Sequence, residues 1–203
     1  LFAVFLILLI LVTQFNAFSS PAIILSSVVL SLAGVFLGIF IFRNDFVIIM
    51  TMVGIISLAG IVVNNAIVLV DYTNLIRRRK REELNLDETT LMPNEDFKAS
   101  VIEGGKTRLR PVLLTAITTI LGLFPLASGL NINFFTLVSD WDPQIFFGGD
   151  NVIFFKPMSL AIIYGLTFAT FLTLVVVPIM YYSIYRFKIW LFKLLKWKVK
   201  IDL

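Results

Sequence analysis

Residues 60–72 read GIVVNNAIVLVDY, and the rest of the chain is best understood from this stretch. It lies within an apolar run from Phe46 to Val70, which is long enough to cross a bilayer as a helix. Asn64 and Asp71 are seven residues apart, so a helix places them on nearly the same face, about 10 Å apart. Polar side chains at that depth are costly unless they face protein or water. We therefore expect their partners to lie outside this segment.

The composition indicates an integral membrane protein. Of the 203 residues, 59% are hydrophobic and only 15% are charged, and the mean hydropathy is +0.96. A soluble domain does not contain such long uncharged runs. The chain has no Cys and no His, which excludes disulfides, thiol chemistry and the usual zinc or haem ligands, so we expect neither a metal nor a cofactor. The basic residues cluster just outside the apolar runs, so the net charge of +4 does not indicate nucleic-acid binding.

Five apolar segments predict an all-α transmembrane domain over residues 1–185. Lipid leaves no partner for unpaired backbone groups, and no segment alternates like a strand of a barrel. Pro21 and Pro111 stand at the start of two segments, where a missing N–H costs nothing. Because the chain opens with Leu1 inside an apolar stretch, we expect it to be a piece of a longer polypeptide. The predicted helices cover residues of about 1–15, 22–42, 46–76, 111–130 and 157–185.

Lysine and arginine predict the orientation of these helices. One basic cluster follows the third segment, one precedes the fourth and one follows the fifth. Simple alternation of the helices puts all three on one side, which we expect to be cytoplasmic. Residues 77–106 and the tail from 186 are then cytoplasmic, and residues 131–156 are periplasmic. Within residues 77–106, we expect a short helix around residues 94–103.

The tail, residues 186–203, predicts an amphipathic helix lying on anionic lipid, with binding to a protein partner as the second interpretation. Its apolar residues recur at helical spacing, opposite a row of lysines. The loop 131–156 is rich in aromatic residues, which favours an ordered loop at the headgroup level over a loop that contacts substrate. The residues of the tail helix are Trp190, Leu194, Trp197 and Ile201 on one face and Lys193, Lys196 and Lys200 on the other.

Polar side chains within the predicted helices are the candidates for function. Asn64 and Asn65 fit two interpretations equally: amides that bond neighbouring helices, or part of an ion or proton pathway. Asp71 lies about two turns before Arg77, and the favoured interpretation is a carboxylate near the interface that reaches water or a basic partner.

The fourth predicted helix offers hydroxyl groups at Thr115, Thr118 and Thr119. Hydroxyls in membrane helices commonly bond to their own backbone, and a hydroxyl track beside the amides of the third helix is the functional alternative. Arg108 and Arg110 flank the cytoplasmic end of this helix, which topology alone explains. The sequence contains no nucleophile–base pair, complete phosphate loop or metal-ligand spacing, so nothing indicates an enzyme.

Five stretches resemble, in collinear order, the membrane part of resistance–nodulation–division (RND) efflux pumps, and the hydrophobe/amphiphile efflux branch is the best match. The stretch GIVVNNAIVLVD resembles the third-from-last helix of those pumps, and GKTRLRPVLLT resembles the start of the next helix. The first covers residues 60–71 and the second 105–115. The other three are FNAFSSP at 15–21, GLFPLA at 122–127 and GLTFATFLTLVVVP at 165–178.

The resemblance implies a twelve-helix antiporter of the bacterial inner membrane, built from two similar halves. This chain would be the last five helices, with the C-terminus in the cytoplasm. The implied partners are the missing N-terminal half, a periplasmic adaptor and an outer-membrane channel around a homotrimer, membrane lipids and small amphiphilic substrates.

The resemblance also implies a proton relay. In the family, two carboxylates on a helix absent from this chain take up protons. Asn64 falls where many members carry a Lys that pairs with them, Asn65 matches a family Asn, Arg108 the relay arginine and Thr115 the relay threonine. Asp71 is included as the carboxylate on the same face as Asn64. A neutral amide at the lysine position leaves two buried carboxylates without a countercharge, so one of them should have a raised pKa.

The predicted function is thus the C-terminal membrane part of a proton- or cation-coupled efflux transporter for drugs or other amphiphiles. Within transport, the alternative is a relative that exports protein or lipid. From another class, the alternative is a non-transporting membrane scaffold that binds a partner through the third and fourth helices.

Overall fold

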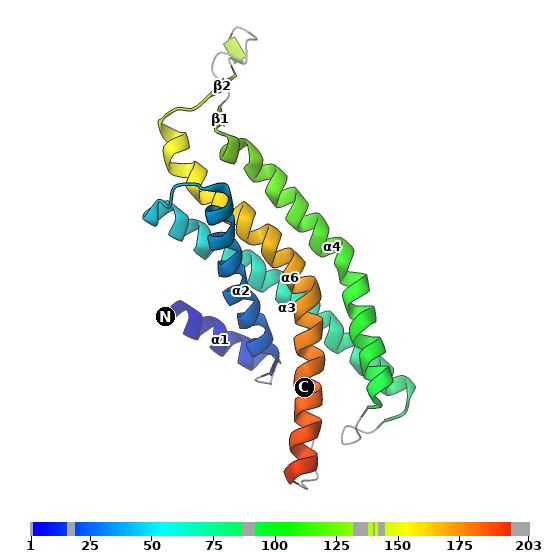
Figure 1. Ribbon diagram of the computed structural model, residues 1–203. Coiled ribbons are helices and arrows are strands. Elements are labelled where there is room, and N and C mark those ends of the chain that lie inside the picture. Colours follow the sequence, from blue (N-terminus) through cyan, green and yellow to red (C-terminus); the bar gives the residue numbers. More distant parts are fainter. Residues whose placement is uncertain are drawn as a thin grey trace. The chain divides into compact units, whose positions relative to one another are not determined.

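The computed structural model describes residues 2–15, 19–86, 92–131, 138–139, 141 and 145–195. Helices dominate these residues, with two short strands between the last two long helices (Figure 1). The elements are α1 Phe2–Phe15, α2 Ser19–Phe42, α3 Ile48–Glu83, α4 Asn94–Ser128, β1 Leu130–Asn131, β2 Phe146–Phe147 and α6 Asp150–Leu195.

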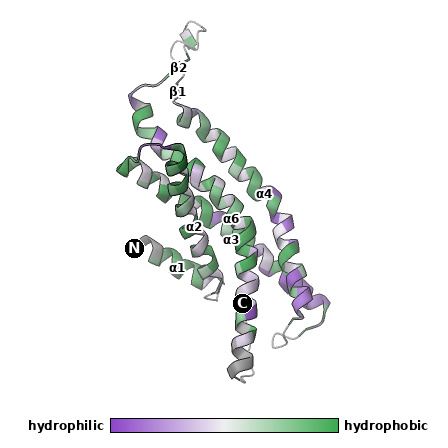
Figure 2. Cartoon of the chain, in the orientation of Figure 1, coloured by the Kyte–Doolittle hydropathy of each residue, from purple (hydrophilic) through white to green (hydrophobic). Residues whose placement is uncertain are grey.

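Four helices in the described part of the chain are long and apolar enough to cross a membrane. They are α2, α3, α4 and the part of α6 from Val152 to Phe187. The apolar helix α1 is shorter, so the first of the five predicted spans stays a prediction. Figure 2 shows hydrophobic residues along these helices and hydrophilic residues around the connection from α3 to α4.

The helix predicted to open at Pro111 begins earlier, at Asn94, so the short helix expected around residues 94–103 is the first part of α4 and not a separate element. Pro111 therefore lies inside α4, where it removes the N–H that would bond the Thr107 carbonyl. The helix α3 also continues past the predicted end at 76 to Glu83. Arg, Lys and Glu in these extensions are good helix formers, so the helices continue beyond the apolar segments. Hydropathy marks the apolar part of a helix and not its ends.

The last helix is longer than predicted at both ends. It was expected over residues 157–185, but α6 runs from Asp150 to Leu195. Asp150, in its first turn, is favourable at the positive end of a helix. Residues 186–195 of the predicted tail continue α6, so up to Leu195 there is no separate interfacial helix. Residues 196–203 lie outside the described part of the chain.

The chain forms two compact units, and α2, α3, α4 and α6 each contribute to both. Unit 1 consists of Leu1–Val29, Val63–Val112 and Phe171–Leu203, and unit 2 of Leu30–Val62 and Leu113–Thr170.

The core of unit 1 joins side chains from α1, α2, α3, α4 and α6. On α3 the buried residues Ala66, Leu69 and Val70 follow the spacing of one helix face. Phe97 of α4 is fully buried against tyrosines of α6. The other core residues are Leu11, Ile23, Ile24, Met92, Val101, Val177, Tyr181 and Tyr185.

Small residues allow the helices of unit 2 to approach closely. A Cβ added at Gly38 of α2 would lie 2.4 Å from Cβ of Tyr164 on α6, which no real structure tolerates. Such glycine contacts are common between membrane helices. In the same unit, β1 pairs antiparallel with β2, with Leu130 opposite Phe147. Gly148 after β2 has a φ of 100°, which a residue with a side chain rarely adopts.

Candidate functional site

The polar stretch of α3 lies in unit 1 and presents two different faces. Ala66, Leu69 and Val70 face the core. Asn64 and Asp71 are both exposed on the surface of the chain, as their seven-residue spacing predicts. Asn65 is half-buried between these faces. The apolar face of α3 is thus satisfied by unit 1, whereas the face carrying Asn64 and Asp71 is open.

The two exposed polar groups have no partner within the residues that the structure describes. Neither Asn64 nor Asp71 forms a side-chain hydrogen bond or an ion pair with another described residue. Within the described residues Asp71 therefore has no basic partner, and its predicted environment, water or a basic residue, stays a prediction. A helix of this length and hydropathy has few ways to satisfy such groups other than protein outside the chain or water.

Arg108 lies against α3 within the same unit. Its guanidinium carbon is 4.3 Å from the ring centroid of Tyr72, the residue after Asp71, in a cation–π contact. The close approach is made possible by Gly104, where an added Cβ would meet Oγ1 of Thr73 at 2.8 Å. The Arg108 Nε is buried and has no hydrogen-bond partner in the described residues. Among the described residues, Arg108 is therefore held by packing and not by a carboxylate.

Thr115 belongs to unit 2, where its side chain is exposed on α4. The neighbouring hydroxyls bond to the backbone of their own helix, which was the first of the two interpretations of these threonines. Thr118 donates to the carbonyls of Leu114 and Thr115 at 2.9 and 3.0 Å, and Thr119 donates to the Thr115 carbonyl at 2.8 Å. Of the five predicted site residues, four thus lie in unit 1 and Thr115 in unit 2.

Sequence reasoning missed a buried aromatic and amide cluster in unit 1, formed by Asn74, Met92, Phe97, Tyr181 and Tyr185. The Tyr181 hydroxyl donates to Oδ1 of Asn74, and the Tyr185 hydroxyl donates to the Met92 carbonyl at 3.0 Å. Phe97 stacks on both tyrosine rings. The available signal was two tyrosines four residues apart at the end of an apolar helix, with an amide near the end of another.

Comparison with known proteins decides the family. The sequence pattern of the AcrB/AcrD/AcrF family matches residues 1–131, which is more than half of the chain. The chain belongs to the AcrB/AcrD/AcrF family. This assignment confirms the predicted relationship to RND efflux transporters, whose members transport and are not enzymes. The predicted hydrophobe/amphiphile branch is a finer assignment, which this match leaves open.

Several relatives match most of this chain. The Swarming motility protein SwrC of Bacillus subtilis (strain 168) is 34% identical over 92% of the chain and 15% of its own length. The Multidrug resistance protein MdtC of Erwinia tasmaniensis is 28% identical, over 82% of the chain and 13% of its own length. The Cobalt-zinc-cadmium resistance protein CzcA of Cupriavidus metallidurans is 28% identical, over 91% of the chain and 14% of its own length. The chain thus spans about 15% of the length of these relatives.

A solved structure supports the same fold. The crystal structure of a heavy metal efflux pump matches 89% of this chain and 14% of its own chain, with 26% identity and a TM-score of 0.63. The helical arrangement is therefore that of the membrane part of an RND transporter.

Proposed function

We propose that this chain is the C-terminal membrane part of a cation-coupled efflux transporter, with the proton as the coupling ion. The observation that carries the proposal is the open face of α3, where Asn64 and Asp71 are exposed and unpartnered within the described residues. In a membrane-spanning helix, such a face requires protein or water. The missing N-terminal part of the transporter would supply both the cover and the carboxylates that bind the proton.

The proposed relay consists of Asn64, Asn65, Asp71, Arg108 and Thr115. Asn64 stands where the resembling pumps commonly have lysine, so it supplies hydrogen bonds instead of a positive charge. An amide can donate to an ionised carboxylate and accept from a protonated one. Asn64 could thereby serve both protonation states without titrating itself.

The proposed substrates are small amphiphiles, as the name of the multidrug relative MdtC suggests. A second candidate class is divalent metal ions, because CzcA and the heavy metal efflux pump match the chain about as well. Export of protein or lipid, or a scaffold role without transport, are the remaining alternatives.

The proposed setting is the bacterial inner membrane, with the C-terminus in the cytoplasm. A homotrimer working with a periplasmic adaptor and an outer-membrane channel would carry substrate out of the cell. The four membrane-length helices support the multi-pass location.

Substitution of Asn64 tests this proposal in the full-length transporter. Asn64→Leu keeps roughly the side-chain volume but removes the amide. A buried polar group that loses its hydrogen-bond partner in this way is destabilised by about 1–3 kcal/mol. We expect it to abolish efflux at matched membrane protein levels, measured by susceptibility to drugs and to divalent metals and by dye efflux. Asn64→Lys, which restores the countercharge common in the family, should retain more efflux than Asn64→Leu.

Val68→Leu is the control, because Val68 is exposed one turn along the same face. It should pump like the wild type. The proposal is wrong if Asn64→Leu also pumps like the wild type, since the amide is then only a packing contact. Resistance to drugs or to metals, whichever the wild type confers, identifies the substrate class.

A further inference from the structure

Unit 2 contains a cavity of about 550 Å³ between the α2–α3 connection and the first turns of α6. The connection contributes Asn44, Asp45 and Val47. The α6 side contributes Val152, Ile153, Lys156, Pro157 and Leu160, together with Asp150 and the glycine pair Gly148–Gly149 before it. The volume falls in the range of about 300–1,000 Å³ that is usual for small-molecule sites.

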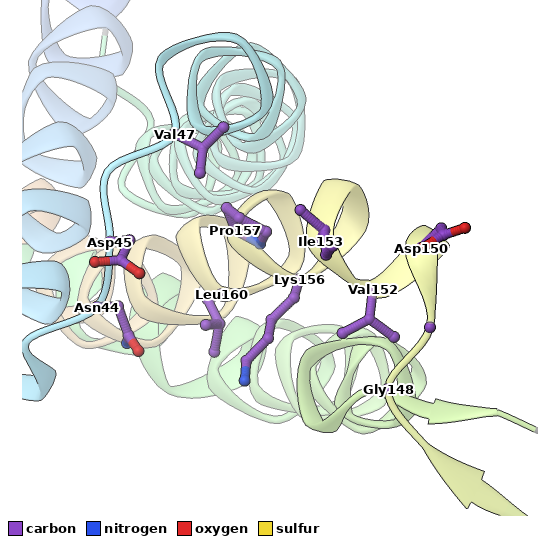
Figure 3. A pocket seen from close by; sticks show the side chains of 11 residues that line it. Asn44, Asp45, Val47, Gly148, Asp150, Val152, Ile153, Lys156, Pro157 and Leu160 are labelled. Carbon is purple, nitrogen blue, oxygen red and sulfur yellow. The ribbon is translucent and has the colours of Figure 1, made fainter.

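The cavity carries both signs of charge without pairing them. In Figure 3, Lys156 extends away from the axis of α6, while Asp45 and Asn44 lie on the connection beside Leu160. Asp45 and Lys156 are exposed, and neither forms an ion pair with another residue that the structure describes. The Asp150 carboxylate points away from the other labelled side chains. The cavity therefore offers one cation and one anion at separate places.

The walls of the cavity are held by specific contacts, so the cavity is preformed. The Asn44 amide donates to the Tyr164 hydroxyl at 2.6 Å, which leaves the Asn44 carbonyl oxygen available as an acceptor. The Tyr164 ring stacks on Phe42 with centroids 5.0 Å apart. On the other side, the Gly148 N–H donates to the Gly129 carbonyl at 3.0 Å.

The cavity lies where membrane helices end. α2 ends at Phe42, α3 begins at Ile48 and the apolar span of α6 begins at Val152, so every lining residue is at or near the end of a span. Two lining residues, Val47 and Ile153, are exposed by 37% and 68%. An occupant would thus have its polar part at the membrane surface and apolar parts beside these side chains.

We propose that this cavity binds the headgroup of a zwitterionic membrane phospholipid, of the phosphatidylethanolamine type. The Lys156 ammonium attracts the phosphate, and Asp45 with the Asn44 carbonyl oxygen accepts hydrogen bonds from the lipid ammonium. A simple anion is disfavoured by Asp45. A divalent cation is disfavoured by Lys156 and by the outward Asp150, and no group of three metal-binding side chains occurs among the described residues. A zwitterion attached to acyl chains satisfies both charges and the apolar rim.

Lipid binding to the full-length protein, purified in detergent and followed by native mass spectrometry, tests the proposal. The probes are a phosphatidylethanolamine and a phosphatidylglycerol with the same acyl chains. The wild type should prefer phosphatidylethanolamine. Asp45→Asn should weaken the binding of phosphatidylethanolamine by about two- to fivefold, as expected for exposed charges. It should also remove the preference for this lipid over phosphatidylglycerol. Lys156→Gln should weaken the binding of both lipids, because both carry a phosphate.

Asp150→Asn is the matched control, because it removes the same charge from a carboxylate that points away and Asn can also begin a helix. It should bind like the wild type. The proposal is overturned if the wild type has no preference, or if Asp45→Asn and Asp150→Asn have equal effects. It is also overturned if water-soluble glycerophosphoethanolamine displaces the lipid at equal concentration, since the ligand is then a free zwitterion. Binding does not require transport, so a pump made inactive by Asn64→Leu should still bind the lipid.

Discussion

The ring of Phe97, near the start of α4, lies flat on the ring of Tyr185 of α6, with centroids 3.7 Å apart and planes 7° from parallel. Phe97 is completely buried and also stacks on Tyr181. This contact attaches the polar beginning of α4 to α6 within unit 1. Its removal should therefore weaken the start of α4, for which the sequence predicts only a short separate helix.

We expect Phe97→Ala to lower the free energy of unfolding by about 3–5 kcal/mol, because it removes a large buried ring and leaves a cavity. Tyr185→Phe keeps the stack but deprives the Met92 carbonyl of its donor, which should cost about 0.5–1.5 kcal/mol. Unfolding in denaturing detergent measures both. Phe40, which is 81% exposed, supplies the control Phe40→Ala. Equal losses for Phe97→Ala and Phe40→Ala would contradict the buried cluster.

Two glycines of α3 should respond oppositely to the same substitution. A Cβ at Gly54 would lie 2.8 Å from the Met158 carbonyl oxygen on α6, and a backbone atom cannot easily give way. A Cβ at Gly60 meets nothing within 4 Å. Gly54→Ala should lower the thermal midpoint of the full-length protein, whereas Gly60→Ala should keep it or raise stability by up to about 1 kcal/mol through helix propensity. A lower midpoint for Gly60→Ala alone would show that the contact between α3 and α6 is wrong.

The predicted topology can be checked by labelling single cysteines, because this chain has none of its own. Ser139 and Asn85 are both exposed. Ser139 lies in the connection predicted to be periplasmic, and Asn85 lies in the connection predicted to be cytoplasmic. A membrane-impermeant thiol reagent should label cysteine at Ser139 in intact cells and cysteine at Asn85 only after permeabilisation. This follows from the three basic clusters on one side. The reverse labelling would refute the orientation and, with it, the cytoplasmic C-terminus.

The apolar helices and the open face of α3 were predictable, because both follow from local patterns. Hydropathy reveals a span, and the spacing of Asn64 and Asp71 against Ala66, Leu69 and Val70 separates two faces. These features do not depend on which helices are neighbours.

The continuity of α4 and the aromatic cluster were not predictable, because they depend on packing between distant segments. Gly104 and Pro111 have low helix propensity, yet α4 continues through both positions. Gly104 instead allows Thr73 of α3 to approach. Asn74 and Tyr181 bond across 107 residues of sequence, a pairing that no local pattern contains.

The contact of Arg108 with Tyr72 gives the sharpest test of the relay within this chain. The guanidinium needs the face of an aromatic ring and not the hydroxyl, so Tyr72→Phe should keep efflux near the wild-type level. Tyr72→Leu removes the ring face and with it a cation–π interaction of about 0.5–2 kcal/mol. Arg108 is then no longer held beside α3. Efflux should then fall although membrane protein levels are unchanged.

Arg108→Lys completes this test. Lysine keeps the charge but loses the planar guanidinium that stacks on a ring, so it should resemble Tyr72→Leu and not the wild type. Because both variants break the same contact, combining them should cost little more than either alone. The measurement is dye efflux at matched expression for the two single variants and the double variant. If the two losses instead add fully, Arg108 and Tyr72 act independently, and Arg108 has no positioned role in the relay.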